Sequence, residues 1–182
     1  RRYLMSCILY IASNNPLPLR ENPHEKLLSV REALALGITD LPDCLLAEDF
    51  DKDKPDVVLY ADRDVVIHED GTVEDGNSPD DFAIFPIEKD ISMQTKKTYC
   101  AQIQWYFTAE RAEGLISYLK EQLKNTENIE LWHGWLDNHF SHPIQRKEIS
   151  IDTLTVADIA TLDKADVVTE PLIHFCLSIT RT

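Results

Sequence analysis

The feature that most constrains the fold is a regular succession of strand-like and helix-like segments between residues 97 and 180. The segment KTYCAQIQWYF at 97–107 alternates apolar and polar side chains, which is the period-two pattern of a half-buried strand. Thr108 can then cap a helix, because the apolar residues after it recur at helical spacing and form one stripe. The stripe consists of Ala112, Leu115, Ile116, Leu119 and Leu123.

Four further segments complete this half of the chain. NIELWHGWL at 128–136 and RKEISI at 146–151 are predicted strands, TVADIATL at 155–162 is a predicted short helix, and PLIHFCLSI at 171–179 is the last predicted strand. The order strand, helix, strand, strand, helix, strand is that of a ferredoxin-like split βαβ unit. We therefore expect a ferredoxin-like half at 97–180.

The first part of the chain predicts a buried strand and then a helix. Residues 4–12 form an apolar run that ends at the turn-forming sequence NNPLPL. Asn22 can cap a helix, a proline follows it, and Glu25 can complete a capping box. We expect a helix near residues 23–36 that ends at Gly37.

Residues 48–90 are strongly acidic, with 15 Asp or Glu against 4 Lys or Arg. They also contain short β-rich runs, DVVLYA, DVVIH and FAIFPI, and the turn signal DGT. We expect an acidic hairpin-rich region at 48–92 within a single α+β domain that spans 1–182. Its sheet is expected to be mixed and largely antiparallel, with two or three helices.

The charge balance narrows the choice of partners. The net charge is -14 and the sequence pI is about 4.7. We expect no nucleic acid partner and no membrane partner, because binding to phosphates and to anionic lipids depends on clustered Lys and Arg. A basic protein surface is the partner that this charge fits.

The chain is expected to be a soluble cytoplasmic protein. The longest uninterrupted apolar run near its start, Cys7–Ala12, is too short to cross a bilayer, and no convincing cleavage site follows it. The four cysteines form no CxxC pair, and Cys7, Cys100 and Cys176 lie in apolar, strand-like surroundings, which suits reduced core thiols in a cytosolic protein. Their even number would also permit two disulfides.

The sequence CILYIASNNPLPL at 7–19, with YLKEQL, IELWHGW and RKEISIDTL later in the chain, resembles a family of small, uncharacterised bacterial cytosolic proteins. These proteins share the strand and turn CILYIAS-x-x-PLPL. The resemblance implies a bacterial, cytosolic origin and no known activity. Members carry a Gly- and Cys-rich stretch around the central strand, where this chain has only Cys100, so the resemblance does not bring a shared ligand to this chain.

The densest group of candidate site residues is ELWHGWLDNHFSH at 130–142. If residues 128–136 form a strand, its two tryptophans face opposite sides. The histidines and Asp137 could in principle meet around zinc, but their spacing matches no compact metal motif. We favour a strand edge with core indoles and a loop of solvated histidines, with no metal, no cofactor and no catalytic residue. The candidate binding residues are Trp132, His133, Trp135, Asp137, His139 and His142.

Other motifs that carry chemistry are weak. His174 and Cys176 share one face of the last predicted strand and could form a nucleophile, yet LIHFCLSI predicts an interior position. The sequence DFDKD at 49–53 imitates the start of an EF-hand loop. Lys54 and Tyr60 stand where that loop requires a glycine and a bidentate glutamate, so we exclude an EF-hand.

Two classes of function follow. The first is a non-catalytic protein-binding module, immunity-like or regulator-like, whose acidic region contacts a basic protein. The alternative is a small-ligand-binding protein or a metal-dependent hydrolase that uses the 132–142 Trp/His stretch, with Trp105 and Tyr106 completing a pocket. The simplest interpretation of the net negative charge is that it only keeps the protein soluble. Homodimer formation through an unpaired sheet edge is left open.

Overall fold

The computed structural model describes residues 6–62, 66–67, 73–74, 78–88, 93–136, 142–163 and 172–181. The chain forms two compact units. Unit 1 comprises Arg1–Asn22 and Asn77–Thr182, and unit 2 comprises Pro23–Gly76. The single domain expected from the sequence stays a prediction.

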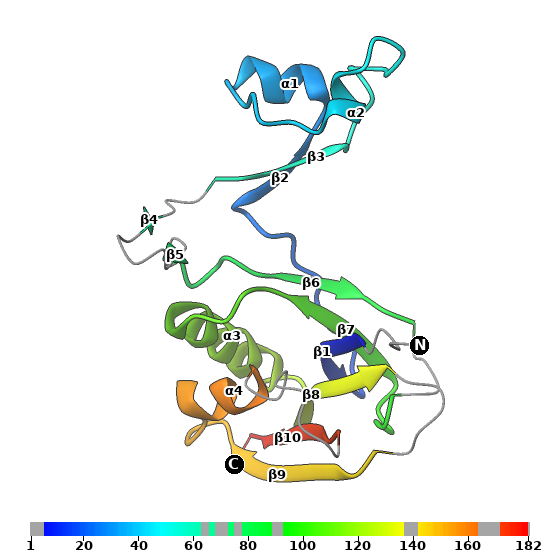
Figure 1. Cartoon of the computed structure of the whole chain (residues 1–182). Coiled ribbons are helices and arrows are strands. Elements are labelled where there is room, and N and C mark those ends of the chain that lie inside the picture. Colours follow the sequence, from blue (N-terminus) through cyan, green and yellow to red (C-terminus); the bar gives the residue numbers. More distant parts are fainter. Residues whose placement is uncertain are drawn as a thin grey trace. The chain divides into compact units, whose positions relative to one another are not determined.

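Unit 1 is built on a six-stranded sheet in the order β6-β7-β1-β8-β10-β9 (Figure 1). All neighbouring strands are antiparallel except β9 and β10, which are parallel. The expected α+β class with a mixed, largely antiparallel sheet is confirmed. The strands and helices of unit 1 are β1 (Ser6–Ser13), β6 (Ala83–Pro86), β7 (Tyr99–Gln104), α3 (Ala109–Gln122), β8 (Asn128–Leu136), β9 (Ile144–Ser150), α4 (Val156–Asp163) and β10 (His174–Thr180).

The spatial order of the strands differs from that of a ferredoxin-like fold. β1 pairs antiparallel with both β7 and β8, so β7 and β8 run parallel with β1 between them. The connection β7–α3–β8 is therefore a split βαβ unit. In a ferredoxin-like fold both helix-linked strand pairs are split in this way, whereas β9 and β10 pair directly. The ferredoxin-like arrangement is not confirmed.

Helix α3 begins where the sequence predicts. The Thr108 hydroxyl accepts a hydrogen bond from the Arg111 backbone N–H at 3.2 Å, which satisfies a donor that the helix itself leaves without a partner. All five residues of the predicted stripe are buried in the main core cluster. They pack with Leu162 of α4 and with sheet residues such as Ile129 and Leu131. Both helices thus share one core with the sheet.

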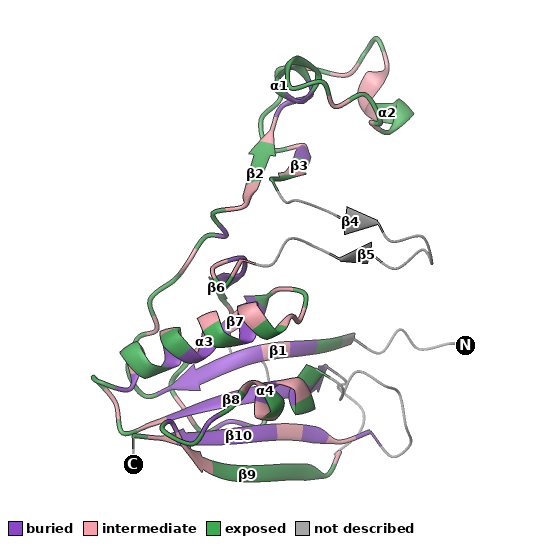
Figure 2. Cartoon of the chain, turned by 90° about the vertical axis from the view of Figure 1, so that its left-hand side faces the viewer, coloured by how far each residue is buried: buried purple, intermediate pink, exposed green. Residues whose placement is uncertain are grey.

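The opposite face of the sheet carries a smaller and more polar core. Its buried members are Ile8, Tyr10, Ala12, Trp132 and Cys176. The rings of Tyr10 and Trp132 stack with their planes 2° apart and their centroids separated by 6.0 Å. Strands β1, β8 and β10 are mostly buried, whereas the edge strand β9 is mostly exposed (Figure 2).

Unit 2 contains a two-stranded ribbon and two short helices. β2 (Glu25–Leu28) pairs antiparallel with β3 (Val58–Ala61). The helices are α1 (Val30–Ala35) and α2 (Asp43–Leu46). A small core of Val30, Ala33 and Val58 joins the ribbon to α1, which gives the ribbon the packing that an isolated hairpin lacks.

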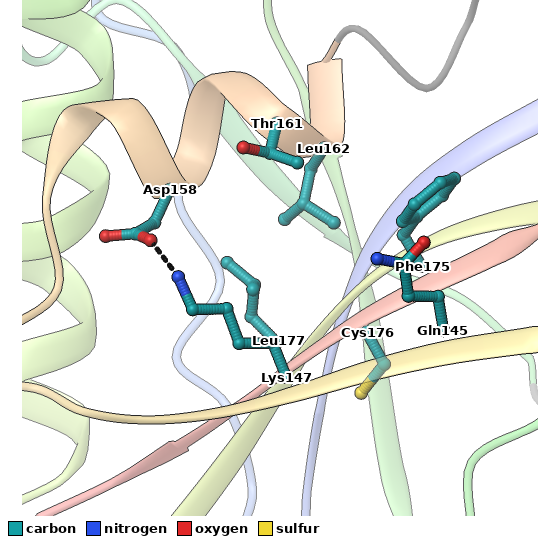
Figure 3. A pocket seen from close by; sticks show the side chains of 8 residues that line it. All are labelled: Gln145, Lys147, Asp158, Thr161, Leu162, Phe175, Cys176 and Leu177. Carbon is teal, nitrogen blue, oxygen red and sulfur yellow. Dashed lines mark hydrogen bonds and ion pairs between the residues drawn. The ribbon is translucent and has the colours of Figure 1, made fainter.

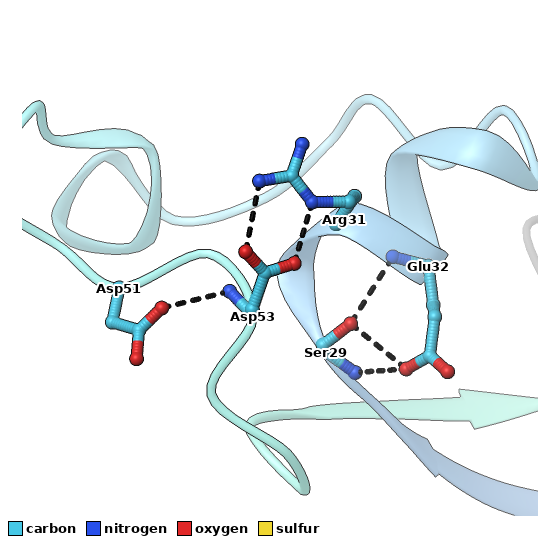
Figure 4. A network of polar contacts seen from close by, with 5 residues as sticks. All are labelled: Ser29, Arg31, Glu32, Asp51 and Asp53. Carbon is cyan, nitrogen blue, oxygen red and sulfur yellow. Dashed lines mark hydrogen bonds and ion pairs between the residues drawn. The ribbon is translucent and has the colours of Figure 1, made fainter.

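The helix expected near 23–36 is wrong in its first part. Residues 25–28 form β2, and the helix begins only after Ser29. Ser29 and Glu32 form a capping box, in which the Ser29 hydroxyl accepts from the Glu32 N–H and the Glu32 carboxylate accepts from the Ser29 N–H (Figure 4). Gly37 has a φ of +81°, which confirms it as the residue that ends the helix.

Asn22 does not cap a helix because it is used elsewhere. It is buried in unit 1, and its Nδ2 donates to Asp81 Oδ1 at 2.7 Å. Arg20 and Ile84 form an antiparallel bridge beside it, with backbone N–H to O distances of 3.1 and 2.8 Å. The segments of unit 1 that come directly before and after unit 2 in the sequence are thus hydrogen-bonded to one another.

The acidic region at 48–92 contributes strands to both units. β3 pairs with β2 in unit 2, and β6 pairs with β7 in unit 1. β4 (Val66–Ile67) and β5 (Val73–Glu74) pair antiparallel on either side of the predicted DGT turn. That turn, at 70–72, lies outside the described residues.

Candidate functional site

The Trp/His stretch begins in β8, and the predicted alternation of this strand is confirmed. Trp132 lies in the smaller core, whereas His133 lies opposite Phe175, which packs against the main core. Trp132, His133 and Trp135 are all buried. They are therefore interior residues on two different faces of the sheet, and they do not line a common pocket.

The remaining three predicted binding residues follow the strand. Asp137 and His139 lie outside the described residues, and His142 is half-buried just before β9. Among the residues that the structure describes, no group of three or more His, Cys, Asp or Glu side chains is placed to hold a metal ion.

The fold brings His174, which lies outside the 130–142 stretch, close to residues of that stretch. The rings of His142 and His174 lie 5.4 Å apart between centroids, and the backbone N–H of Trp135 donates to His174 Nδ1 at 3.2 Å. Burial, followed by the nearby His142 and His133, lowers the pKa of His174 below its usual range. We call His133, His142 and His174 the histidine cluster. His174 is held as a neutral imidazole that accepts a hydrogen bond.

Glu130 is the most connected buried carboxylate on the smaller core side of the sheet. It accepts hydrogen bonds from Thr95 Oγ1 at 2.6 Å, Trp132 Nε1 at 2.8 Å and Arg146 Nη1 at 2.9 Å. Burial alone would raise the pKa of Glu130, but these hydrogen bonds outweigh it and hold the pKa below the usual range. The carboxylate is ionised and surrounded by donors, which suits a structural role better than proton transfer.

The predicted pair of His174 and Cys176 does not form an activated nucleophile. Burial raises the pKa of Cys176 to about 12, so the thiol stays protonated at neutral pH. None of the four cysteines forms a disulfide. Cys7 and Cys44 are exposed, which corrects the expectation that Cys7 lies in the interior.

A small pocket lies between α4 and the parallel strands β9 and β10 (Figure 3). The side chains of Lys147 and Asp158 form an ion pair beside it at 2.5 Å, and Leu162 and Phe175 supply apolar surface. Its volume is about 90 Å³, well below the range of about 300–1,000 Å³ that is usual for small-molecule sites. None of the predicted pocket aromatics lines it.

The charged surface of unit 2 is the other candidate site. Between residues 23 and 62 there are ten Asp or Glu against four Lys or Arg. Nine of these acidic side chains are exposed, and only Glu25 is half-buried. Arg31 and Asp53 form an exposed bidentate pair, with N–O distances of 2.5 and 2.9 Å (Figure 4), so one of the few cations is already neutralised.

Comparisons with protein-family models, curated proteins and solved structures returned no match. The resemblance to a bacterial family therefore stays a prediction. Among the described residues, no helix combines the length and the apolar character needed to cross a membrane.

Proposed function

We propose that this chain is a non-catalytic protein-binding module, of the immunity or regulatory kind, which offers unit 2 to a basic protein. The observation that carries the proposal is the concentration of exposed carboxylates in unit 2. Its 54 residues, Pro23–Gly76, hold 15 Asp or Glu against 5 Lys or Arg, a net charge of -10 out of -14 for the chain.

This distribution has a physical consequence for association. Clustered charge of one sign steers an oppositely charged partner into encounter and repels like-charged competitors. The same field disfavours nucleic acid and anionic membranes, which have the wrong sign. We place the protein in the bacterial cytosol, where its thiols stay reduced.

A catalytic role has less support. Glu130 is saturated with donors, and the thiol of Cys176 is protonated at neutral pH because burial raises its pKa to about 12. A metal-dependent hydrolase at 132–142 would need ligands that converge, and no such group occurs among the described side chains. The aromatics proposed for a ligand pocket do not gather, because Trp132 and Trp135 lie on opposite faces of β8.

Affinity capture with a matched pair of variants tests the proposal. One variant neutralises three exposed carboxylates of unit 2, Asp40→Asn, Glu48→Gln and Asp49→Asn. The other neutralises three exposed carboxylates of unit 1, Glu113→Gln, Glu127→Gln and Asp152→Asn. Both remove the same net charge from the chain.

The expected result is a basic protein, identified by mass spectrometry, that the wild-type chain and the unit 1 variant retain at low salt. The unit 2 variant should retain much less of it, and moderate salt should weaken all three interactions. Equal retention by the two variants, or no enriched basic protein at low salt, contradicts the proposal.

A further inference from the structure

The β2–β3 ribbon exposes a pair of leucines on one face. Leu27 and Leu59 lie directly opposite one another in the register of the ribbon. Their exposed fractions are 57% and 58%. The next pair along the ribbon, Leu28 and Val58, points to the other face and packs into the core of unit 2. Each face of the ribbon therefore carries one apolar pair, and only the Leu28–Val58 pair is covered by the core of unit 2.

A single exposed leucine is ordinary, but two that face each other form one contiguous apolar surface. Side chains directly opposite in an antiparallel pair have their Cβ atoms about 4.5–5.5 Å apart, so both can contact the same partner group. The centre of a protein interface has this character, because desolvated anchors there supply most of the binding energy.

The surroundings of the pair indicate what would cover it. Glu25 lies on the same face two positions along β2, opposite Ala61, and unit 2 as a whole carries a net charge of -10. An apolar pair with carboxylates near it is complementary to apolar side chains flanked by Lys or Arg, and it repels an acidic partner.

We infer that the ribbon face around Leu27 and Leu59 is the anchor of the interface, and that it receives a basic segment of the partner whose apolar side chains lie between Lys or Arg residues. This inference rests on the proposed function. It adds the place at which the partner docks and the chemistry of the segment that docks there.

Two synthetic peptides test it. The first is an amphipathic peptide with Leu on one side and Lys on the other, and the second carries Ser in place of every Leu at the same charge. Their dissociation constants are measured by fluorescence anisotropy against the full-length chain and three variants, Leu27→Ser, Leu59→Ser and Leu19→Ser. Leu19 is the matched control, because it lies in unit 1 and is 58% exposed.

We expect the wild-type chain to bind the Leu/Lys peptide at least about tenfold more tightly than the Ser/Lys peptide, which is the effect of burying one leucine. Leu27→Ser and Leu59→Ser should each remove most of that difference, and Leu19→Ser should keep it. Circular dichroism confirms that each variant is folded, and Leu59→Met should bind as the wild type does.

Two results would overturn the inference. The wild-type chain would bind both peptides with equal affinity, or Leu19→Ser would lose as much affinity as Leu59→Ser. Equal binding of both peptides leaves the proposed function intact, since charge alone then carries the interaction. Equal retention of the partner by the two charge variants in the capture experiment contradicts the proposed function, whereas the peptide comparison tests the leucine anchor separately.

Discussion

Asp81 and Arg111 form an ion pair in which both side chains are buried, with exposed fractions of 0% and 1%. Asn22 Nδ2 donates to the second oxygen of the same carboxylate, and Arg111 Nη1 donates to the Tyr106 carbonyl at 3.0 Å. The pair therefore links α3 to the two segments that flank unit 2 in the sequence. A buried pair of this kind makes folding sensitive to the loss of either partner, because the other is left as an uncompensated charge.

Removal of the guanidinium should destabilise unit 1. We expect Arg111→Met to lower the free energy of unfolding by about 3–5 kcal/mol, since Asp81 then stays buried without its cation. Urea unfolding followed by tryptophan fluorescence measures this, because all three tryptophans lie in unit 1. Lys124→Met is the control, because its pair with Glu121 is exposed and is worth only about 0.2–1 kcal/mol. Equal losses in the two variants would contradict the argument.

Gly114 in α3 should not tolerate alanine, although alanine is the better helix former. A Cβ at this position would stand 1.6 Å from the Pro79 carbonyl oxygen, so the backbone around residue 79 must move. Helix propensity favours alanine by about 1 kcal/mol, but we expect Gly114→Ala to destabilise unit 1 by about 1–3 kcal/mol through overpacking. Ser117→Ala, on the exposed side of the same helix, should be neutral or slightly stabilising. A stabilised Gly114→Ala in the same urea experiment would refute the close contact.

Local patterns predicted the elements of unit 1 well, because period and capping are short-range properties. The alternation in β8 and the stripe of α3 fix which side chains face the core. The partners of a strand are set by long-range packing, so nothing in the sequence showed that β1 inserts between β7 and β8. The helix predicted near 23–36 begins too early because the chain has a second capping sequence, Ser29 to Glu32, which makes the cap while Asn22 is bonded to Asp81.

The candidate sites show the same difference between what local patterns predict and what long-range packing decides. The opposite facing of Trp132 and Trp135 followed from alternation alone, and it already argued against a shared pocket. The approach of His174 to His142 joins residues 32 positions apart, and no local pattern reports it. The leucine pair of the ribbon has no local signal for a related reason, since the capping sequence at Asn22 places Leu27 in a predicted helix and its partner Leu59 becomes visible only through the pairing of β2 with β3.

The histidine cluster should make unit 1 less stable in mild acid. The pKa of His174 is lowered in the folded state from an ordinary value of 6.5, so the unfolded chain binds this proton more readily. Folding stability is then greatest above that value and falls as the pH drops below it. Protonation would also remove the acceptor of the Trp135 N–H. We expect the free energy of unfolding to be lower at about pH 5.5 than at about pH 7.5.

A variant separates this effect from other titrations. His174→Gln should show a smaller difference between the two pH values than the wild-type chain. His24→Gln, which changes a histidine of unit 2, should show the same difference as the wild type. If His174→Gln keeps the full difference, the acid sensitivity comes from other groups.

Glu130 should also make folding stability depend on pH, in a range below that of His174. The protein should lose stability as this carboxylate becomes protonated. Its pKa is held below the ordinary value of 4.5, so its contribution to stability is complete above that value and is lost as the pH falls through the lowered pKa. We expect Glu130→Gln to lower the free energy of unfolding at neutral pH by about 1.5–3 kcal/mol, because the charge-assisted bond to Arg146 is lost. The same variant should also flatten the acid limb of the stability curve, measured by urea unfolding at a series of pH values.

Glu127→Gln is the control, because Glu127 is exposed and close to Glu130 in the chain. It should leave the free energy of unfolding and the acid limb unchanged. A Glu130→Gln protein as stable as the wild type, with the same acid limb, would show that the hydrogen bonds from Thr95, Trp132 and Arg146 do not stabilise the charged carboxylate.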